Sequence, residues 1–462
     1  MSYLTIAYVS VAVILLFGAA IFVHEWGHYW VALKRGLKVE EFAIGFGPKL
    51  FAWKRGEVLW TVRAIPAGGF VKLPQMITSE ALEGSSGGEQ LAPISPLSKI
   101  LVAFAGPFMN VVFAFAIAGF LYFVGLPVLV NPSYIGHVEP GSAEGQLGIQ
   151  EGDQIVAVNG NPVDSWQQIR MEVIFATTNV FDVSIARAGV TNTYQLTART
   201  REGTGGLKWL DLPPREAPVV GAVETGKPAD LAGLKAGDRF VYFDGVPVYS
   251  QEQLVDLVNK SNGLESEVIV LRDGEELSFK VTPFYDEETK RGRIGIGFAA
   301  GTYFVQKPGP TPVEQIADVL DQMKRTVIAL WPGSNSGVGA KDLSGPVGIL
   351  TGIAYQLTID YRLALSFMVL LNINLAILNL LPVPVLDGGH ITMSIYEAIF
   401  RRPVSLRFQE YATGFFALLL IFFMLYVTVF GDIARFGQMK SLFRHAAQSE
   451  VVTETNTVPA AP

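Results

Sequence analysis

Four long apolar stretches divide the chain, and each is long enough to cross a lipid bilayer. They cover residues 1–33, 99–127, 362–390 and 411–430. About 20 consecutive apolar residues in a helix match the hydrocarbon thickness of a bilayer. Residues 130–300 instead mix polar with apolar positions and carry the turn residues that separate short strands. The pattern predicts a multi-domain membrane protein with four transmembrane helices and a large soluble insertion.

The first apolar stretch leads directly into a candidate metal-binding motif, His24-Glu25-Trp26-Gly27-His28. On a helix, His24 and His28 share one face and can bind the same zinc ion, as in HExxH motifs. Glu25 points to one side of this pair, where it can accept a proton from water instead of binding the metal. Ionisable groups at membrane depth are costly to bury, which favours a functional site over a pair of structural histidines.

A zinc site needs a third protein ligand, and the end of the third apolar stretch offers two candidates. Asp387 and His390 follow the prolines at 382 and 384. Proline and glycine interrupt a helix and free the backbone to place a side chain. A helix-capping role for Asp387 is the structural alternative.

The amino-acid composition excludes several classes of protein for this chain. The chain has 462 residues, of which 50% are hydrophobic, and a mean hydropathy of +0.35. It is too apolar for an ordinary soluble enzyme and too polar for a pure membrane bundle, so embedded and aqueous domains are both expected. The net charge of −7 argues against nucleic acid as a partner. The lack of cysteine excludes disulfides and thiolate catalysis.

The N-terminal apolar run resembles a secretory signal, but no basic region precedes it and it continues into the metal motif. We therefore interpret it as an uncleaved anchor. Basic residues follow it closely, at Lys34, Arg35, Lys38, Lys49, Lys54, Arg55, Arg63 and Lys72. Because cytoplasmic loops are enriched in Lys and Arg, this side is predicted to be cytoplasmic. The second crossing then places residues 130–300 outside.

Residues 34–98 separate the first two apolar stretches and contain a β-like region and a linker. Short alternating segments in 39–73 are interrupted at Pro66-Ala67-Gly68-Gly69. They predict either a plain cytoplasmic hairpin or a re-entrant hairpin whose free edge pairs with an extended substrate. Residues 76–95 are rich in Ser, Gly and Glu, which is typical of a flexible linker.

The soluble insertion contains an internal repeat. Its Gly-Asp pair at 152–153 recurs 85 positions later at 237–238, and the turn glycine at 160 recurs at 245. Both copies place a short strand and an Asn-Gly or Asp-Gly turn after that pair. The pattern is similar to PDZ domains, which bind an extended chain or free C-terminus. We expect PDZ-like α+β domains at 128–214 and 215–300. Their candidate ligand loops, for which ordinary turns are the equal alternative, are Tyr134-Ile135-Gly136 and Val219-Val220-Gly221.

Residues 301–361 are predicted to contain an amphipathic helix and a connector. Thr311, Pro312 and Glu314 form a helix start with a capping box, and apolar residues follow at helical spacing. This helix is expected to lie on the membrane surface, with packing against the PDZ-like pair as the alternative. Asn110, in the second apolar stretch, is interpreted as a structural hydrogen-bonding group between helices, with a pore-facing group as the alternative. Residues 431–462 are expected to form an interfacial helix and a disordered tail.

Taken together, these motifs resemble the site-2 protease family, intramembrane zinc metalloproteases of the peptidase M50-like type. The resemblance rests on HExxH in the first membrane helix, two PDZ-like repeats after the second, and Asn379 through Leu386-Asp387-Gly388 at the end of the third. It runs from about residue 3 to 443. It implies that one zinc ion is bound by His24, His28 and Asp387 and that Glu25 activates the attacking water. It also implies substrate contacts at Asn374 and Asn379, and at Gly68 and Gly69 of the β region.

The resemblance further implies a reaction and a setting. The reaction is cleavage within the transmembrane segment of a single-pass membrane protein, such as an anti-sigma factor, after a first protease has trimmed it. The setting is envelope stress signalling at a bacterial inner membrane, with periplasmic PDZ domains and an active site toward the cytoplasm. A membrane metal transporter and a non-catalytic PDZ scaffold are the rival classes. The inverted repeats of membrane segments that are typical of transporters are not visible in the sequence.

Overall fold

The computed structural model describes residues 3–76, 94–129, 132–139, 141–200, 207–261, 263–287, 291–299, 302–331, 336, 338–402, 404–433 and 450–452. The chain divides into two compact units. The first comprises residues 1–126, 307–323 and 343–435, and the second comprises 127–306, 324–342 and 436–462. Most of the expected linker at 76–95 and of the expected tail at 431–462 lies outside the described residues.

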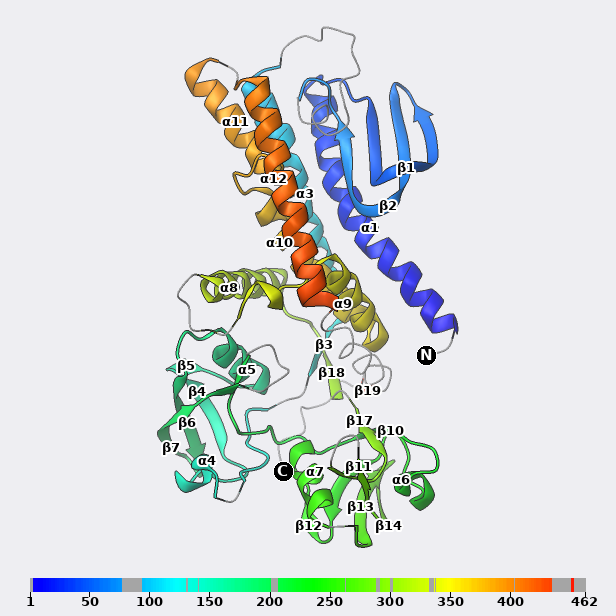
Figure 1. Cartoon of the computed structure of the whole chain (residues 1–462), viewed down its shortest axis with the longest axis vertical. Helices are drawn as coiled ribbons and strands as arrows, with labels where there is room; N and C mark the ends of the chain where they lie inside the picture. The colour runs from blue at the N-terminus through cyan, green and yellow to red at the C-terminus, as the bar shows by residue number, and fades with distance from the viewer. Residues whose placement is uncertain are drawn as a thin grey trace. The chain divides into compact units, whose positions relative to one another are not determined.

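The first unit consists of long apolar helices and a two-stranded sheet (Figure 1). Its helices are α1 (Tyr3–Lys34), α3 (Pro96–Val124), α9 (Pro346–Ile359), α10 (Tyr361–Asn379), α11 (Asp387–Phe400) and α12 (Leu406–Tyr426), the last continued by a π-helix (Val427–Ile433). In the described part of the chain, four helices are long and apolar enough to cross a membrane, at 3–34, 96–124, 361–379 and 407–433. The four predicted helices of membrane-spanning length are therefore present.

The third apolar stretch, expected over 362–390, is divided into two helices, with the interruption that its prolines predicted. Helix α10 ends at Asn379, and α11 begins at Asp387. Pro382 and Pro384 lie between the two helices and cannot donate helical hydrogen bonds, which explains the break. Asp387 is thereby the first residue of a new helix. Helix α9 is a further short apolar helix in the region where the sequence suggested a connector.

Helices α1 and α3 approach each other closely at small residues. A methyl group on Gly27 of α1 would lie 2.3 Å from the carbonyl oxygen of Ala105 on α3. Ala20, Ala114 and Ala118 are fully buried in the same core. Small side chains let helix backbones meet in an apolar environment. The close approach falls within the metal motif itself, because Gly27 lies between His24 and His28, and it places α3 directly against the motif.

Strands β1 (Glu41–Arg55) and β2 (Val58–Lys72) form the antiparallel hairpin that the sequence predicted, and they lie beside α1 (Figure 1). At its base, Phe42 and Trp60 stack with ring centroids 4.5 Å apart, and Tyr29 of α1 packs edge-on against both rings. Ile44 pairs with Gly69 across the hairpin. The aromatic cluster anchors the hairpin on the helix that carries the metal motif.

The second unit contains two copies of a small α+β domain, each with its own hydrophobic core. The first copy has α4 (Ala143–Gln146), β4 (Gln154–Val158), β5 (Asn161–Pro162), α5 (Trp166–Phe175), β6 (Val180–Arg187) and β7 (Val190–Thr197), followed by β8 (Arg199–Thr200) and β9 (Lys208–Trp209). The second copy has β10 (Val220–Val223), α6 (Pro228–Ala232), β11 (Arg239–Phe243), β12 (Val246–Pro247), α7 (Gln251–Lys260), β13 (Ser266–Arg272) and β14 (Glu275–Val281), followed by β15 (Phe284–Asp286), β16 (Arg291–Arg293) and β17 (Ile296–Phe298).

The two copies repeat each other down to single interactions. Their four-stranded sheets have the equivalent orders β5-β4-β6-β7 and β12-β11-β13-β14. The repeated aspartate is buried in each copy and paired with an arginine at the end of the equivalent strand, as Asp153 with Arg187 and Asp238 with Arg272. Each arginine also donates to a loop carbonyl, at Gly148 and Gly233. The predicted internal repeat is confirmed.

The remaining elements connect the domains. Strand β3 (Leu126–Leu129) neighbours β18 (Thr302–Gln306), which pairs with β19 (Glu450–Val452), and a short 3-10 helix covers Ala340–Asp342. Helix α8 (Pro312–Leu330) begins as predicted: the Thr311 N–H donates to Glu314 Oε2, and the Glu314 N–H donates to Thr311 Oγ1. These reciprocal hydrogen bonds form the expected capping box.

Candidate metal centre

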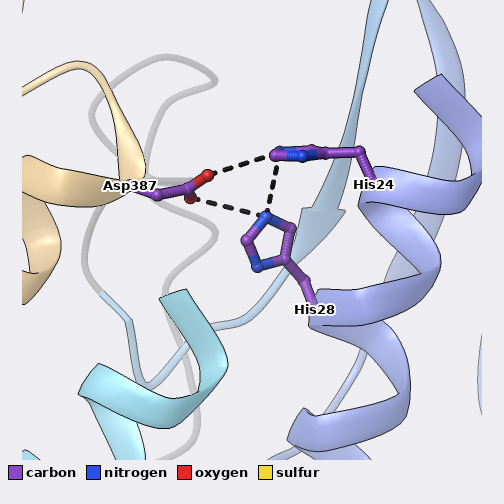
Figure 2. A group of neighbouring side chains, drawn as sticks. All are labelled: His24, His28 and Asp387. Carbon is purple, nitrogen blue, oxygen red and sulfur yellow. Dashed lines mark hydrogen bonds and ion pairs between the residues drawn. The ribbon is translucent and has the colours of Figure 1, made fainter. Parts of the chain in front are cut away.

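Three side chains from opposite ends of the chain meet in the first unit (Figure 2). His24 and His28 come from successive turns of α1, and their Nε2 atoms are 3.2 Å apart. Asp387, at the start of α11, places Oδ2 3.3 Å from His24 Nε2 and Oδ1 3.4 Å from His28 Nε2. In the part of the chain that the structure describes, this is the group of acidic or histidine side chains arranged to hold a metal ion, and His390 is not part of it.

The spacing of these atoms fits a tetrahedral zinc ion. Zinc ligands at about 2.0–2.1 Å from a tetrahedral centre lie roughly 3.3–3.4 Å from one another. The two Nε2 atoms are 3.2 Å apart, and each lies 3.3 or 3.4 Å from a different oxygen of Asp387, so all three distances are within about 0.2 Å of that spacing. Two imidazoles and one carboxylate are also a donor set that zinc accepts, and they leave a fourth position open for water. The donors therefore match a catalytic rather than a closed structural site.

Gly106 of α3 keeps the metal position free of protein atoms. A methyl group at this residue would lie 2.2 Å from His28 Nε2 and 2.8 Å from His24 Cε1. Such distances are far below van der Waals contact, so a side chain larger than hydrogen would displace the histidines. The helix that faces the motif is thus shaped to leave space at the metal-binding nitrogens.

Helix α3 also holds the other nitrogen of each histidine. His28 Nδ1 is 2.8 Å from the carbonyl oxygen of Val102, to which its N–H donates. This hydrogen bond leaves the Nε2 lone pair directed at the metal position. His24 Nδ1 lies 3.2 Å from Nδ2 of Asn110. The interhelical contact that was predicted for Asn110 is therefore present, and its partner is a candidate ligand.

Glu25 lies next to the three candidate ligands but is not one of them. Its side chain is buried, with 7% exposure. Strand β2 approaches it at Gly69, where a methyl group would lie 2.8 Å from Glu25 Cγ. A carboxylate that is beside a metal position, yet free of it, is suited to accept and return a proton.

Of the other candidate substrate residues, the structure places Asn379 and Gly69 next to the metal site. Asn379, the last residue of α10, has Nδ2 3.4 Å from His24 Nε2 and so borders the metal position. The Oδ1 atom of Asn374 is buried and has no hydrogen-bond partner among the described residues. Gly69 faces Glu25, whereas a methyl group on Gly68 would meet the ring of Phe46 instead.

The candidate PDZ ligand loops belong to the second unit, and their backbone amides are already engaged. The Ile135 N–H donates to the Asp153 carbonyl, and the Gly136 N–H donates to that of Pro213. The Val220 N–H likewise donates to the Asp238 carbonyl. Tyr134 and Val219 form isolated bridges, with Gln154 and Arg239, and Gly221 lies in β10, which pairs with β17. Ligand binding by these loops stays a prediction.

Four apolar helices of membrane length and a zinc-type donor set are the features expected of a membrane-embedded metalloprotease, and the similarity to known proteins identifies the family. Residues 12–423 match the model for peptidase family M50, and the chain belongs to that family. It is 31% identical to "Putative zinc metalloprotease NMA0084" of Neisseria meningitidis, over 89% of this chain and 96% of that protein. It is 30% identical to "Regulator of sigma-E protease RseP" of Escherichia coli, over 91% of this chain and 97% of that protein.

A second RseP, from Salmonella typhimurium, is 30% identical over 94% of this chain and 100% of that protein. Among solved structures, the PDZ domain of an SdrC-like protein from Listeria monocytogenes covers 18% of this chain and 86% of that chain, with 19% identity and a TM-score of 0.17. The chain is thus a multi-pass membrane protein and an intramembrane zinc metalloprotease of family M50. The resemblance to site-2 proteases is confirmed.

Sequence reasoning missed the supporting residues on α3. Asn110 was visible as an amide in an apolar helix, but nothing in its spacing pointed to His24. Val102 acts through its carbonyl, which every residue has, and Gly106 acts through the lack of a side chain. The usable signal was the Gly-x-x-x-Asn spacing in a helix next to the motif, which becomes informative once α3 is known to cross α1.

Proposed function

We propose that this protease cleaves peptide bonds inside the transmembrane segments of single-pass membrane proteins, with its zinc ion held by His24, His28 and Asp387. The observation that carries the proposal is the set of 3.2–3.4 Å separations among these donors in a unit of membrane-length helices. Zinc bound at this position would act as a Lewis acid. It would polarise the scissile carbonyl and lower the pKa of a bound water molecule toward neutral pH.

The side chains around the donors supply the remaining chemistry. Glu25 accepts the proton of the attacking water and delivers it to the departing amine nitrogen. Asn379, whose amide nitrogen borders the same position, donates a hydrogen bond to the oxygen on which negative charge develops. Burial in apolar surroundings strengthens both effects, because few water molecules compete for these groups.

The β1–β2 hairpin provides a place for the substrate backbone. A transmembrane helix keeps its carbonyls in its own hydrogen bonds, so it must unwind before one of them can be attacked. An unwound strand can replace those bonds by pairing with a free strand edge. Gly69 brings β2 to within contact of Glu25, so a strand added near residues 68–70 passes close to the candidate base.

The natural substrates are inferred from the relatives. Two of the relatives carry the name "Regulator of sigma-E protease RseP", and this link to sigma-E favours membrane-bound anti-sigma factors as substrates. The basic residues after α1 favour a cytoplasmic position for that side of the bacterial inner membrane. The PDZ-like pair, which follows α3, is then periplasmic and acts as a size filter that admits substrates only after a first trimming cut.

Proteolysis in detergent solution tests the proposal directly. The purified full-length chain is incubated with a peptide that contains one membrane helix, with a zinc chelator and after zinc is restored. We expect cleavage inside the apolar segment, located by mass spectrometry, and we expect it to stop with chelation and return with zinc. Cleavage that continues after complete zinc removal would contradict the proposed metal centre.

A further inference from the structure

We propose that Asn110 is a positioning residue that holds the His24 ring so that its Nε2 faces the zinc position. The inference rests on the proposed metal centre and deepens it. It assigns a role to an amide that lies 3.2 Å from the far nitrogen of His24 and is itself 0% exposed.

Three residues form a stripe on α3 beside the two histidines. Val102, Gly106 and Asn110 are spaced by four residues and so share one face of the helix. Each of them meets the histidine pair: Val102 through its carbonyl, Gly106 through the space that it leaves, and Asn110 through its amide. One face of α3 therefore contacts both imidazole rings, with its hydrogen-bonding groups at their Nδ1 atoms.

The direction of the hydrogen bond between Asn110 and His24 Nδ1 determines the role of Asn110. A neutral imidazole that presents its Nε2 lone pair to a metal carries its proton on Nδ1. His28 donates that proton to the Val102 carbonyl. His24 needs an equivalent acceptor, and Asn110 is the group at its Nδ1. The amide oxygen of Asn110 is buried and has no hydrogen-bond partner in the described residues, so it is available for this proton.

A half turn of the terminal amide exchanges its oxygen and nitrogen with little change in shape. With the oxygen toward His24, Asn110 accepts the Nδ1 proton and its buried oxygen gains a partner. With the nitrogen toward His24, the amide instead favours the other tautomer, in which an N–H points at the metal position. Zinc binding therefore selects the first arrangement, and Asn110 is one side chain that can serve it without adding charge to the membrane core.

Asn372 on α10 shows what a merely structural asparagine looks like in this unit. It is also 0% exposed, but its amide donates to the Met368 carbonyl of its own helix at 2.8 Å. Asn110 has no such bond within its own helix among the described residues. Asn372 therefore serves as a matched control for the loss of a buried amide.

The test measures zinc affinity in the purified full-length chain, by competition with a chromophoric chelator. Asn110→Leu should weaken zinc binding by about 10- to 100-fold, the usual effect of removing the partner of a metal-bound histidine. Asn372→Leu should leave the zinc affinity close to that of the wild type. Asn110→Asp, which keeps an acceptor of the same shape, should retain most of the affinity lost in Asn110→Leu.

The outcomes separate this inference from the proposed function. If Asn110→Leu binds zinc no more weakly than Asn372→Leu, the positioning role is wrong. If Asn110→Leu does not fold, Asn110→Asp decides: a loss of zinc binding in that variant overturns the inference, and retention supports it. His24→Ala tests the metal centre itself, because zinc binding that survives this substitution removes the proposed site and not only its support.

Discussion

At the scale of single residues, the metal centre depends on two glycines as much as on its charged groups. Gly106 leaves room at the histidine nitrogens, and Gly69 lets β2 reach Glu25. Both positions lie on elements other than the one that carries HExxH. A glycine here is required because a close approach leaves no space for a side chain, and not because of its backbone freedom.

Gly106→Ala should therefore disable the centre. The added methyl group falls 2.2 Å from His28 Nε2, and an overpacked core typically loses about 1–3 kcal/mol of stability. We expect zinc affinity, measured by chelator competition, and peptide cleavage both to fall. Gly119→Ala on the same helix is the control, because a methyl group there has no neighbour within 4 Å. Equal behaviour of the two variants would show that Gly106 is not needed for space.

Glu25→Gln should separate zinc binding from catalysis. The amide has nearly the same shape as the carboxylate but cannot accept and return a proton, so cleavage should fall by about 10²- to 10⁴-fold. Zinc content, measured by metal analysis of the purified protein, should stay unchanged because Glu25 is outside the donor group. A variant that keeps its zinc and its full activity would exclude Glu25 as the base.

At the scale of elements, each PDZ-like domain is tied together by the same buried ion pair. The Asp238 carboxylate is 0% exposed and receives two hydrogen bonds from Arg272, at 2.6 and 2.7 Å. It also accepts from the Lys235 N–H, which fixes the loop before β11. The pair thus joins the end of β13 to the repeated Gly-Asp turn, and the equivalent pair does so in the first copy.

Arg272→Ala should destabilise the second copy strongly. Removing one partner of a buried pair leaves a charge without compensation and costs on the order of 3 kcal/mol. Thermal unfolding of the full-length chain should show an earlier transition. Lys260→Ala is the comparison, since it removes an ion pair to Asp256 in which both side chains are well exposed. Such surface pairs contribute little, so an equally early transition in that variant would contradict the role of burial.

At the scale of the whole molecule, the soluble insertion begins and ends at neighbouring strands. Strand β3 enters it and β18 leaves it, and the two are adjacent in one sheet. An insertion with adjacent ends can be removed without stretching the chain that remains. This arrangement permits a direct test of the proposed size filter.

Deletion of residues 130–300 should allow cleavage of a substrate that still carries its bulky outer domain. In the intact chain, the same substrate should be cut only after trimming. Gel analysis of trimmed and untrimmed substrates, with both forms of the enzyme, measures the discrimination. Unchanged preference for trimmed substrate after the deletion would reject the filter, while cleavage of trimmed substrate by the shortened chain serves as the control for folding.

Much of this architecture was predictable because its causes are local in the sequence. Apolar length indicated the membrane helices, the 85-residue recurrence indicated the paired domains, and Thr311 with Glu314 indicated the start of α8. The residue at which α11 begins was less predictable than the interruption before it. Proline marks where a helix is interrupted, but the point at which the next helix resumes depends on what the new helix packs against.

The sequence by itself determined that His24 and His28 share a helix face in an apolar segment, because helical period and bilayer thickness act within one stretch of chain. Only the tertiary structure decided that Asp387 and not His390 reaches those nitrogens, and that Asn110, Val102 and Gly106 support them from behind. The physical reason is that these contacts depend on how α1, α3 and α11 cross. That crossing is set by side-chain packing between helices that are far apart in the sequence.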